Sequence, residues 1–397
     1  MPCPENIDRK EKKNFRSSMD FSLLTPVSDR LFESIELSHF QSLGRKLKVH
    51  TSQTLPDLEG VNIAIFGVLE TRNATDDIGE TFQLDEVRKS LYSLFPGNWS
   101  VNIVDLGDLK NGASVNDTYF AVSQLIKSLL EQKIIPIIIG GSQDLTYANY
   151  RAYDNLQPMV NIVNVDTNFD LGDASQPIKN NSYFGKIILE EPYNLFNYST
   201  IGYQTYFNSQ EEIDLMERLY FEAYRLGEVS NNISSVEPVL RDAHMVTVDL
   251  KSVRAAEVGE RLKFTPNGLD GKEICAITRY AGISNKVTSF GIYEYHFEPK
   301  DTITAMLVAQ MIWYFIEGVN CRVKDDDFEN SNNYLKYNVL IENEELIFFK
   351  SVKTGRWWIE IPFLANLNNK LKKHTLLPCA HEDYVSATEG KIPERWN

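Results

Sequence analysis

The sequence contains few cysteines, and no two of them are close together. The four, Cys3, Cys275, Cys321 and Cys379, are scattered over 397 residues. Without a C-x-x-C pair the chain has no cysteine-based zinc motif. We therefore expect reduced, structural thiols, as in proteins of a reducing compartment.

Long apolar runs and an excess of positive charge are also missing. No apolar run approaches the roughly 20 residues that span a membrane, and the N-terminus lacks the hydrophobic region of a signal peptide. There are 40 Lys and Arg against 55 Asp and Glu, which gives a formal net charge of −15. This charge argues against a general binder of nucleic acid or of anionic membranes. We expect a cytoplasmic protein with no nucleic-acid partner and no membrane insertion.

The chain divides into three parts by composition. Residues 1–18 are polar and charged and are expected to be a disordered tail, with Met19 as a candidate for the true start. Strands alternate with helices from about residue 61, which predicts an α/β domain over 19–320: a three-layer α/β/α sandwich with a mostly parallel sheet.

Residues 321–397 have a different character. YLKYNVLIE, ELIFFKS and RWWIEI are typical of three short antiparallel strands, and the remainder of the segment reads as irregular. Roughly 75 residues with three strands bury little core alone. We therefore expect a small C-terminal β-rich extension that packs on the α/β domain.

Polar clusters follow four of the predicted strands. They are GGSQD at 140–144, DTNFD at 166–170, DLK at 249–251, and Glu294 after SFGIY. The carboxyl ends of parallel strands meet at one edge of a sheet, where α/β proteins bind ligands. Residues two apart in an extended segment point the same way. Asp166, Asn168 and Asp170 are therefore expected to share one face, as are Asp249 and Lys251.

These segments resemble the motifs of the ureohydrolase family, which comprises arginase, agmatinase and formimidoylglutamase. That family carries G-G-x-H, D-A-H-x-D, S-x-D-x-D and a later glutamate in this order, and this chain has GGSQ, DTNFD, TVDLK and YEYHFEP. The resemblance covers roughly 60 to 320 and implies an arginase-like fold. The end, PCAHEDYVSATEGKIPERW, resembles a Bacteroidetes-type subgroup labelled formimidoylglutamase.

The resemblance also implies a metal site. In the family, two manganese ions share a bridging hydroxide that attacks a guanidinium or formimidoyl carbon, because a metal pair makes water nucleophilic at neutral pH. The ions are held by two imidazoles and four carboxylates. The family's metal positions fall here on Gln143, Asp166, Asn168, Asp170, Asp249 and Lys251. Glu294 matches the acid that would hold the cationic end of the substrate. His296, two residues later, is the histidine expected nearest this cleft.

Half of these metal positions have lost or weakened their ability to bind a metal. The amide oxygens of Gln143 and Asn168 are poor ligands for borderline transition metals, and the ammonium of Lys251 repels cations. We expect this ammonium to replace the second metal, between Asp166 and Asp249. No cofactor is therefore favoured, and manganese is expected only if the family activity is retained. The alternative is a single magnesium or calcium ion on the three remaining aspartates.

Three functions stay open at this point. The favoured hypothesis is a pseudoenzyme with a degenerate metal site that acts as a structural or partner-binding protein. The alternatives are an active formimidoylglutamase or guanidino-type C–N hydrolase with a remodelled site, and a small-molecule sensor or binding module. Trp357 and Trp358 point to opposite faces of a strand, so one of them is a candidate anchor for an unknown protein partner. Family members often form trimers or hexamers, which leaves a homo-oligomer open.

Overall fold

A central β-sheet organises most of the chain. The computed structural model describes residues 21–75, 83–173, 175–258, 265–295, 301–325, 331–341, 344–361 and 376–393. The expectations for the tail 1–18 and for Met19 lie outside these residues. Within them, ten strands form one sheet in the order β1-β4-β3-β5-β10-β9-β6-β7-β8, with β2 also paired to β4. All pairs are parallel except β1 with β4.

The strands of this sheet are short. They are β1 (Leu24–Thr25), β2 (Lys48–Val49), β3 (Ile63–Val68), β4 (Ile103–Leu109), β5 (Ile135–Gly140), β6 (Val160–Val165), β7 (Leu195–Tyr203), β8 (Glu222–Arg225), β9 (Met245–Asp249) and β10 (Ser289–Tyr293). The central strands β3, β5, β6, β9 and β10 are buried along their whole length. Such continuous apolar runs are typical of parallel strands covered on both faces.

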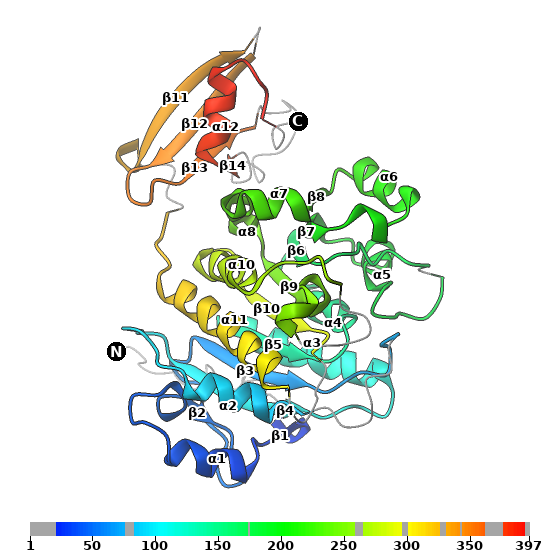
Figure 1. Ribbon diagram of the computed structural model, residues 1–397, viewed down its shortest axis with the longest axis vertical. Helices are drawn as coiled ribbons and strands as arrows, with labels where there is room; N and C mark the ends of the chain where they lie inside the picture. The colour runs from blue at the N-terminus through cyan, green and yellow to red at the C-terminus, as the bar shows by residue number, and fades with distance from the viewer. Residues whose placement is uncertain are drawn as a thin grey trace, which may run out of the picture.

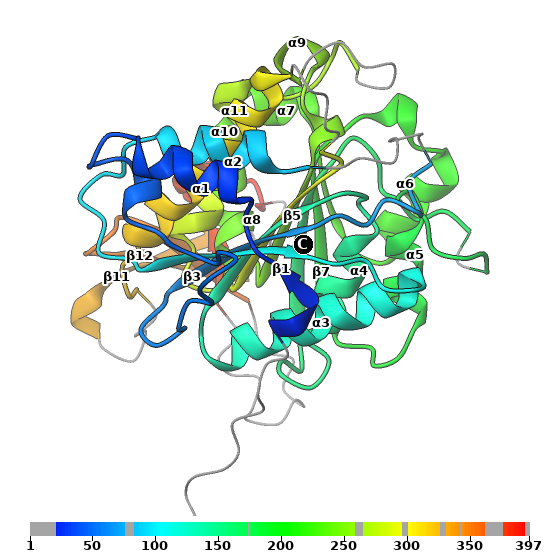
Figure 2. The same cartoon turned by 90° about the horizontal axis from the view of Figure 1, so that it is seen from below.

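Helices cover both faces of the sheet. Figure 2 shows α1, α2, α10 and α11 on one side and α3, α4 and α5 on the other. The helices are α1 (Asp29–Glu36), α2 (Asp85–Ser93), α3 (Val115–Glu131), α4 (Leu145–Arg151), α5 (Tyr183–Leu189), α6 (Gln210–Arg218), α7 (Leu226–Asn231), α8 (Glu237–Asp242), α9 (Ala255–Val258), α10 (Gly271–Ile283) and α11 (Thr302–Asn320). The predicted α/β/α sandwich is therefore confirmed.

The start of a long helix follows from its sequence. Ser114 accepts a hydrogen bond from the backbone of Asp117, and the carboxylate of Asp117 accepts one from the backbone of Ser114. This capping box satisfies amide groups that have no partner within α3. Asp270 and Glu273 begin α10 in the same way. Both helices therefore start where the sequence places their caps.

Helix α11 corrects one sequence-based statement. It has 19 residues with a mean hydropathy of 1.4, so it is long and apolar enough to cross a membrane. In the structure 61% of this segment is buried. A Cβ atom on Gly282 of α10 would lie 2.2 Å from the carbonyl oxygen of Phe315, so the two helices touch backbone to backbone. Helix α11 is therefore a core helix of the sandwich.

A second, antiparallel sheet follows α11 and lies beside α7 and α8 (Figure 1). Its strands pair in the order β11-β12-β13-β14. They are β11 (Tyr334–Ile341), β12 (Glu344–Ser351), β13 (Trp357–Glu360) and β14 (Leu376–Cys379), followed by helix α12 (His381–Thr388). The β-rich extension is confirmed, but its last part is not irregular: it supplies a fourth strand and a helix.

Both tryptophans of β13 are buried, so neither serves as an exposed anchor. Trp357 is 5% exposed and stacks with Tyr384 of α12, and Trp358 is 6% exposed on the other face. The guanidinium carbon of Arg241 lies 4.6 Å from the ring centroid of Trp358. The side chain of Arg241 also donates hydrogen bonds to the carbonyls of Trp357 at 3.1 Å and Cys379 at 3.0 Å. Arg241 thus joins α8 to the second sheet.

This junction gives a stability prediction. Arg241→Met keeps a long side chain over Trp358 but removes a donor from two buried carbonyls, each worth about 1–3 kcal/mol when left unpaired. We expect the free energy of unfolding to fall by about 3 kcal/mol. Urea denaturation followed by tryptophan fluorescence measures it, with the exposed Arg45→Met as the control. Equal stability of the two variants would contradict this account of the junction.

Candidate functional site

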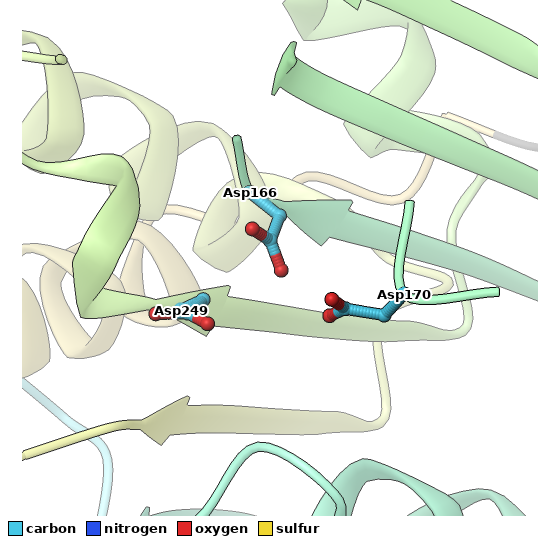
Figure 3. Close-up of side chains that lie close together, drawn as sticks. All are labelled: Asp166, Asp170 and Asp249. Carbon is cyan, nitrogen blue, oxygen red and sulfur yellow. The ribbon is translucent and has the colours of Figure 1, made fainter. Parts of the chain in front are cut away.

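Three buried aspartates converge at the carboxyl edge of the parallel sheet. Asp166 directly follows β6, Asp170 lies four residues later, and Asp249 is the last residue of β9 (Figure 3). One carboxylate oxygen from each lies within 4.8 Å of the others. The three residues are 1%, 7% and 5% exposed, respectively. This arrangement concentrates negative charge in a small volume away from water.

Two of the three carboxylates are held by neutral donors. The Oδ1 atom of Asp166 accepts a hydrogen bond from the backbone of Asn168 at 3.0 Å, and Oδ1 of Asp249 accepts one from the backbone of Lys251 at 2.6 Å. Asp170 differs, because its Oδ2 atom is buried with no hydrogen-bond partner among the described residues. Its φ of 54° lies in the left-handed region. Such strain is common at functional sites.

Lys251 points into the site and binds an acid. Its Nζ lies 2.8 Å from Oε2 of Glu294, and the two side chains are 22% and 0% exposed. Burial alone would lower the pKa of Lys251, but the charges of Asp249 and Glu294 outweigh it and raise that pKa. The ammonium also acts on the aspartates, since its charge lowers the pKa of Asp166, Asp170 and Asp249. The contact with Glu294 is one that the sequence did not predict.

The backbone conformation of Glu294 places its side chain between the GGSQD turn and Lys251. Its φ of 59° is left-handed, and its N–H donates to the carbonyl of Gly141 at 2.6 Å. The other carboxylate oxygen accepts hydrogen bonds from the backbone of Gln143 at 2.8 Å and from the side chain of Asn180 at 3.0 Å. Glu294 thus connects the GGSQD turn to Lys251. His296, the other cleft residue expected from the sequence, lies outside the described residues.

The two amide residues at the family's histidine positions do not join the aspartates in the same way. Gln143 is fully buried, and its Nε2 donates to Asn164 at 3.1 Å while its Oε1 has no partner among the described residues. Asn168 instead donates to the carbonyl of Phe207 at 3.0 Å. The side chain of Asn168 is thus bound to the segment after β7, while its backbone binds Asp166. Strand β6 ends at Val165, so the strict alternation of an extended segment stops before Asn168.

Two residues of the site were missed from the sequence: Asn180, which binds Glu294, and Asn164. Asn164 is fully buried in β6 and donates to Oδ2 of Asp166 at 3.1 Å. Its own oxygen accepts hydrogen bonds from Thr247 at 2.8 Å and from Gln143. The signal was an asparagine within the apolar run VNIVNV, because a buried amide needs partners. Asn164 is therefore a positioning residue for Asp166.

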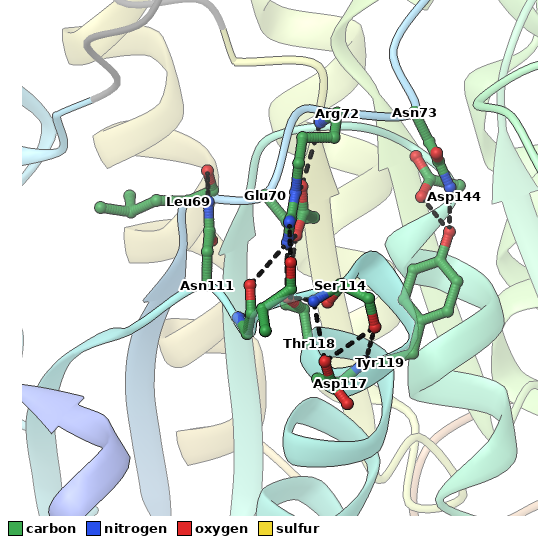
Figure 4. A network of polar contacts seen from close by, with 12 residues as sticks. Leu69, Glu70, Arg72, Asn73, Asn111, Ser114, Asp117, Thr118, Tyr119 and Asp144 are labelled. Carbon is green, nitrogen blue, oxygen red and sulfur yellow. Dashed lines mark hydrogen bonds and ion pairs between the residues drawn. The ribbon is translucent and has the colours of Figure 1, made fainter.

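The loop after β3 closes the neighbouring side of the site. The carboxylate of Glu70 accepts a hydrogen bond from Nε of Arg72 at 2.8 Å, and Asn73 donates to the hydroxyl of Tyr119 at 2.8 Å (Figure 4). That hydroxyl in turn binds the carboxylate of Asp144. Burial raises the pKa of Asp144 to about 6.

This loop also explains the second glycine of GGSQD. A Cβ atom on Gly141 would lie 2.3 Å from the carbonyl oxygen of Glu70, which leaves no room for a side chain. The close approach lets the N–H of Ser142 bind that carbonyl at 3.0 Å. The turn that carries Gln143 is therefore fixed by backbone packing.

Comparison with known proteins assigns the family. The model of the arginase family matches residues 61–317. The chain belongs to the arginase family. The formimidoylglutamase of Streptococcus gordonii is 23% identical over 285 residues, which cover 66% of this chain and 86% of that protein. The formimidoylglutamase of Staphylococcus carnosus is 24% identical over 302 residues, which cover 71% and 93%.

Solved structures of this family have the same fold. Trypanosoma cruzi formiminoglutamase with Mn²⁺ aligns with a TM-score of 0.59 at 16% identity, covering 68% of this chain and 97% of that one. The Bacillus subtilis formimidoylglutamase gives 0.59 at 17% identity, covering 66% and 88%. At these identities the likeness concerns the fold alone. The arginase-family match ends at residue 317, before the second sheet begins.

The donor set of this arginase-family protein fits one divalent cation. Burial raises the pKa of Asp166, Asp170 and Asp249, and the mutual repulsion of their charges adds to the effect for Asp170 and Asp249. A cation would relieve this repulsion and give the unpartnered Oδ2 of Asp170 a partner. Three carboxylates form an all-oxygen site of the kind that suits magnesium or calcium. The positive charge of Lys251 lowers the pKa of all three aspartates, so a second cation would be repelled by the ammonium.

The raised pKa values predict an unusual dependence of stability on pH. A carboxyl whose pKa is higher in the folded protein binds extra protons there, so stability falls as pH rises through that window. For Asp144 the window runs from 3.8 to about 6, and the three aspartates extend it upward. We expect the cation-free protein to melt at a higher temperature at pH 5.5 than at pH 8.

A pair of matched variants isolates this effect from the overall negative charge. Asp144→Asn and Asp214→Asn remove the same charge, but Asp144 is fully buried and Asp214 is exposed. Asp144→Asn should flatten the melting-temperature profile between pH 4 and 6, whereas Asp214→Asn should leave it unchanged. Parallel profiles for the two variants would refute the assignment.

Proposed function

We propose that this arginase-family protein is a divalent-cation-dependent C–N hydrolase of the formimidoyl or guanidino class that uses one cation position in place of two. The convergence of Asp166, Asp170 and Asp249, with oxygens within 4.8 Å of one another, carries the proposal. It departs from the pseudoenzyme hypothesis because the three acids would hold a cation without histidine. A divalent cation bound there would supply Lewis acidity and make a water molecule more acidic.

Charge balance supports one cation. With Glu294, the site holds four carboxylates against the single ammonium of Lys251, so the ionised site carries −3. Buried charge of this size is costly. One divalent cation brings the total to −1, and the protonation of one carboxyl would bring it to zero. Two cations beside Lys251 would instead leave a positive site.

The chain's own residues would bind and orient the substrate. Asn164 holds Asp166 in place, and Glu294 is held by Gln143 and Asn180. The ammonium of Lys251 would attract negative charge that develops on the reacting group. It also neutralises Glu294, so a cationic substrate group would have to displace it. A formimidoyl group in its neutral form fits this balance better than a permanently charged guanidinium.

Isothermal titration of the metal-free protein with Mg²⁺ and Mn²⁺ tests the cation site. Release of formamide from N-formimidoyl-glutamate and of urea from guanidino acids tests the activity. We expect one cation per chain and hydrolysis that is lost on chelation and in Asp249→Asn. Binding of two manganese ions per chain, or hydrolysis that survives chelation, would contradict the proposal.

The second candidate is a non-catalytic binding protein, as the sequence favoured. The Lys251–Glu294 contact at 2.8 Å supports it, because the protein's own ammonium occupies the acid that a cationic substrate would need. Cation binding without turnover of either substrate class would support this candidate. The cytoplasmic location and the identity of any protein partner stay predictions from the sequence under both candidates.

A further inference from the structure

A cavity lies at the same edge of the sheet as the aspartates. It has a volume of about 380 Å³ and lies between the loop after β7, the start of α7 and the loop before α10. Tyr203, Tyr206, Arg225, Gly227, Arg254 and Gly268 are among its lining residues. None of the three aspartates lines it. Its size suits a small ligand.

The cavity is lined by two arginines and no acid. Arg254 is neutralised by Glu257, whose Oε1 lies 2.6 Å from its Nη2. The exposed Arg225 differs, because no carboxylate of the described residues lies within salt-bridge distance of its guanidinium. The nearby Glu228 instead accepts a hydrogen bond from the backbone of Arg225 at 3.3 Å. The chain has a net charge of −15, so a cavity whose arginine has no acid partner among the described residues is a local site of positive charge.

Two tyrosines provide the other walls. The ring of Tyr203 packs against Phe169 with centroids 5.0 Å apart, which holds this side chain at the cavity. Arg225 lines the same cavity as Tyr203. Burial raises the pKa of Tyr203, the charge of Arg225 lowers it, and the charges of Glu228 and Glu217 raise it. Tyr206 is 65% exposed, and its ring meets that of Phe207 edge to face with centroids 4.7 Å apart. A cation beside a hydroxyl donor is a recognition pattern for oxyanions.

We propose that this cavity binds a small molecule with a carboxylate or phosphate group, and that Arg225 anchors that group. The guanidinium would donate two parallel hydrogen bonds to two oxygens of the anion, with Tyr203 beside it. The remaining part of the ligand would lie against the exposed ring of Tyr206. The proposal does not depend on the cation site, since the two sites share no residue.

Isothermal titration of the full chain with glutarate and with inorganic phosphate, at ionic strength matched with NaCl, tests the proposal. Saturable binding is expected for at least one of the two, and the one that binds tells which oxyanion the cavity prefers. Glutaramide, the neutral analogue of glutarate, should not bind. Saturation by neither anion, or equal binding of glutaramide and glutarate, would overturn the proposal.

Variants locate the site. Arg225→Gln should weaken binding by about 10-fold or more and Arg225→Lys by less, because lysine keeps the charge but not the paired donors. Arg45→Gln, at an exposed site elsewhere, should bind as the wild type does. Affinity that is unchanged in Arg225→Gln would overturn the proposal.

A filling variant provides a test that keeps the charge. A Cβ atom on Gly227 would meet no atom within 4 Å. Gly227→Phe should therefore fold normally and place its ring in the cavity. Loss of anion binding with an unchanged melting temperature would support the site, and undiminished binding would overturn it.

Discussion

Lys251→Ala is expected to lower the free energy of unfolding of the cation-free protein by about 3 kcal/mol at pH 8. The substitution removes the ammonium that lies 2.8 Å from the fully buried Glu294. It also removes the charge that lowers the pKa of Asp166, Asp170 and Asp249. Four buried carboxylates would then face one another without a compensating cation.

Two further measurements separate this effect from a simple loss of packing. The loss of stability should shrink at pH 5.5, because the aspartates can protonate, and it should shrink when Mg²⁺ is added. Lys272→Ala is the matched control, since that side chain is 92% exposed and its ammonium lies 3.8 Å from Asp270. A penalty that depends on neither pH nor Mg²⁺ would show that Lys251 acts by packing alone.

Asp170→Asn should raise the stability of the cation-free protein and weaken the binding of the cation. Without a cation, the variant should be more stable than the wild type at pH 8, because it removes a buried charge whose pKa is well above its ordinary value. An added cation should stabilise the variant much less than it stabilises the wild type, since one anionic ligand has gone. We expect the affinity for Mg²⁺ or Mn²⁺ to fall at least about 100-fold, more than the loss of an outer-shell partner produces.

The backbone makes asparagine the right substitution at this position. The φ of Asp170 is 54°, and asparagine adopts the left-handed region more readily than most residues. Melting curves with and without Mg²⁺ measure both effects, and the exposed Asp214→Asn is the control. If Mg²⁺ stabilises the Asp170→Asn variant as strongly as the wild type, the three aspartates are not the cation site.

The sequence predicted the fold better than the contacts of the site. Buried apolar runs such as IIPIII and the polar residues that follow them were enough to place Asp166 and Asp249 at one edge of a parallel sheet. Alternation could not place Asn168, because the strand ends at Val165. The partner of Lys251 depends on the left-handed backbone of Glu294, which no local pattern in the sequence indicates.

The end of the chain was mispredicted for a related reason. Helix α12 has eight residues and begins two positions after β14. Of its residues, Ala387 is the one that is fully buried. A helix with so few buried apolar residues shows no clear helical spacing of apolar residues in the sequence. The helix instead packs on the sheet through Tyr384, whose ring stacks on Trp357 of β13.

The ion pair between Lys251 and Glu294 restricts the order in which this site could change. Lys251→Asp as a first step would add another buried carboxylate before any new cation could be held, so that intermediate should be less stable than its parent. Gln143→His as a first step adds a neutral ligand, and the melting temperatures of the two single variants would show which path is open. We therefore expect a path toward a second cation to cost less stability when it begins with Gln143→His than when it begins with Lys251→Asp.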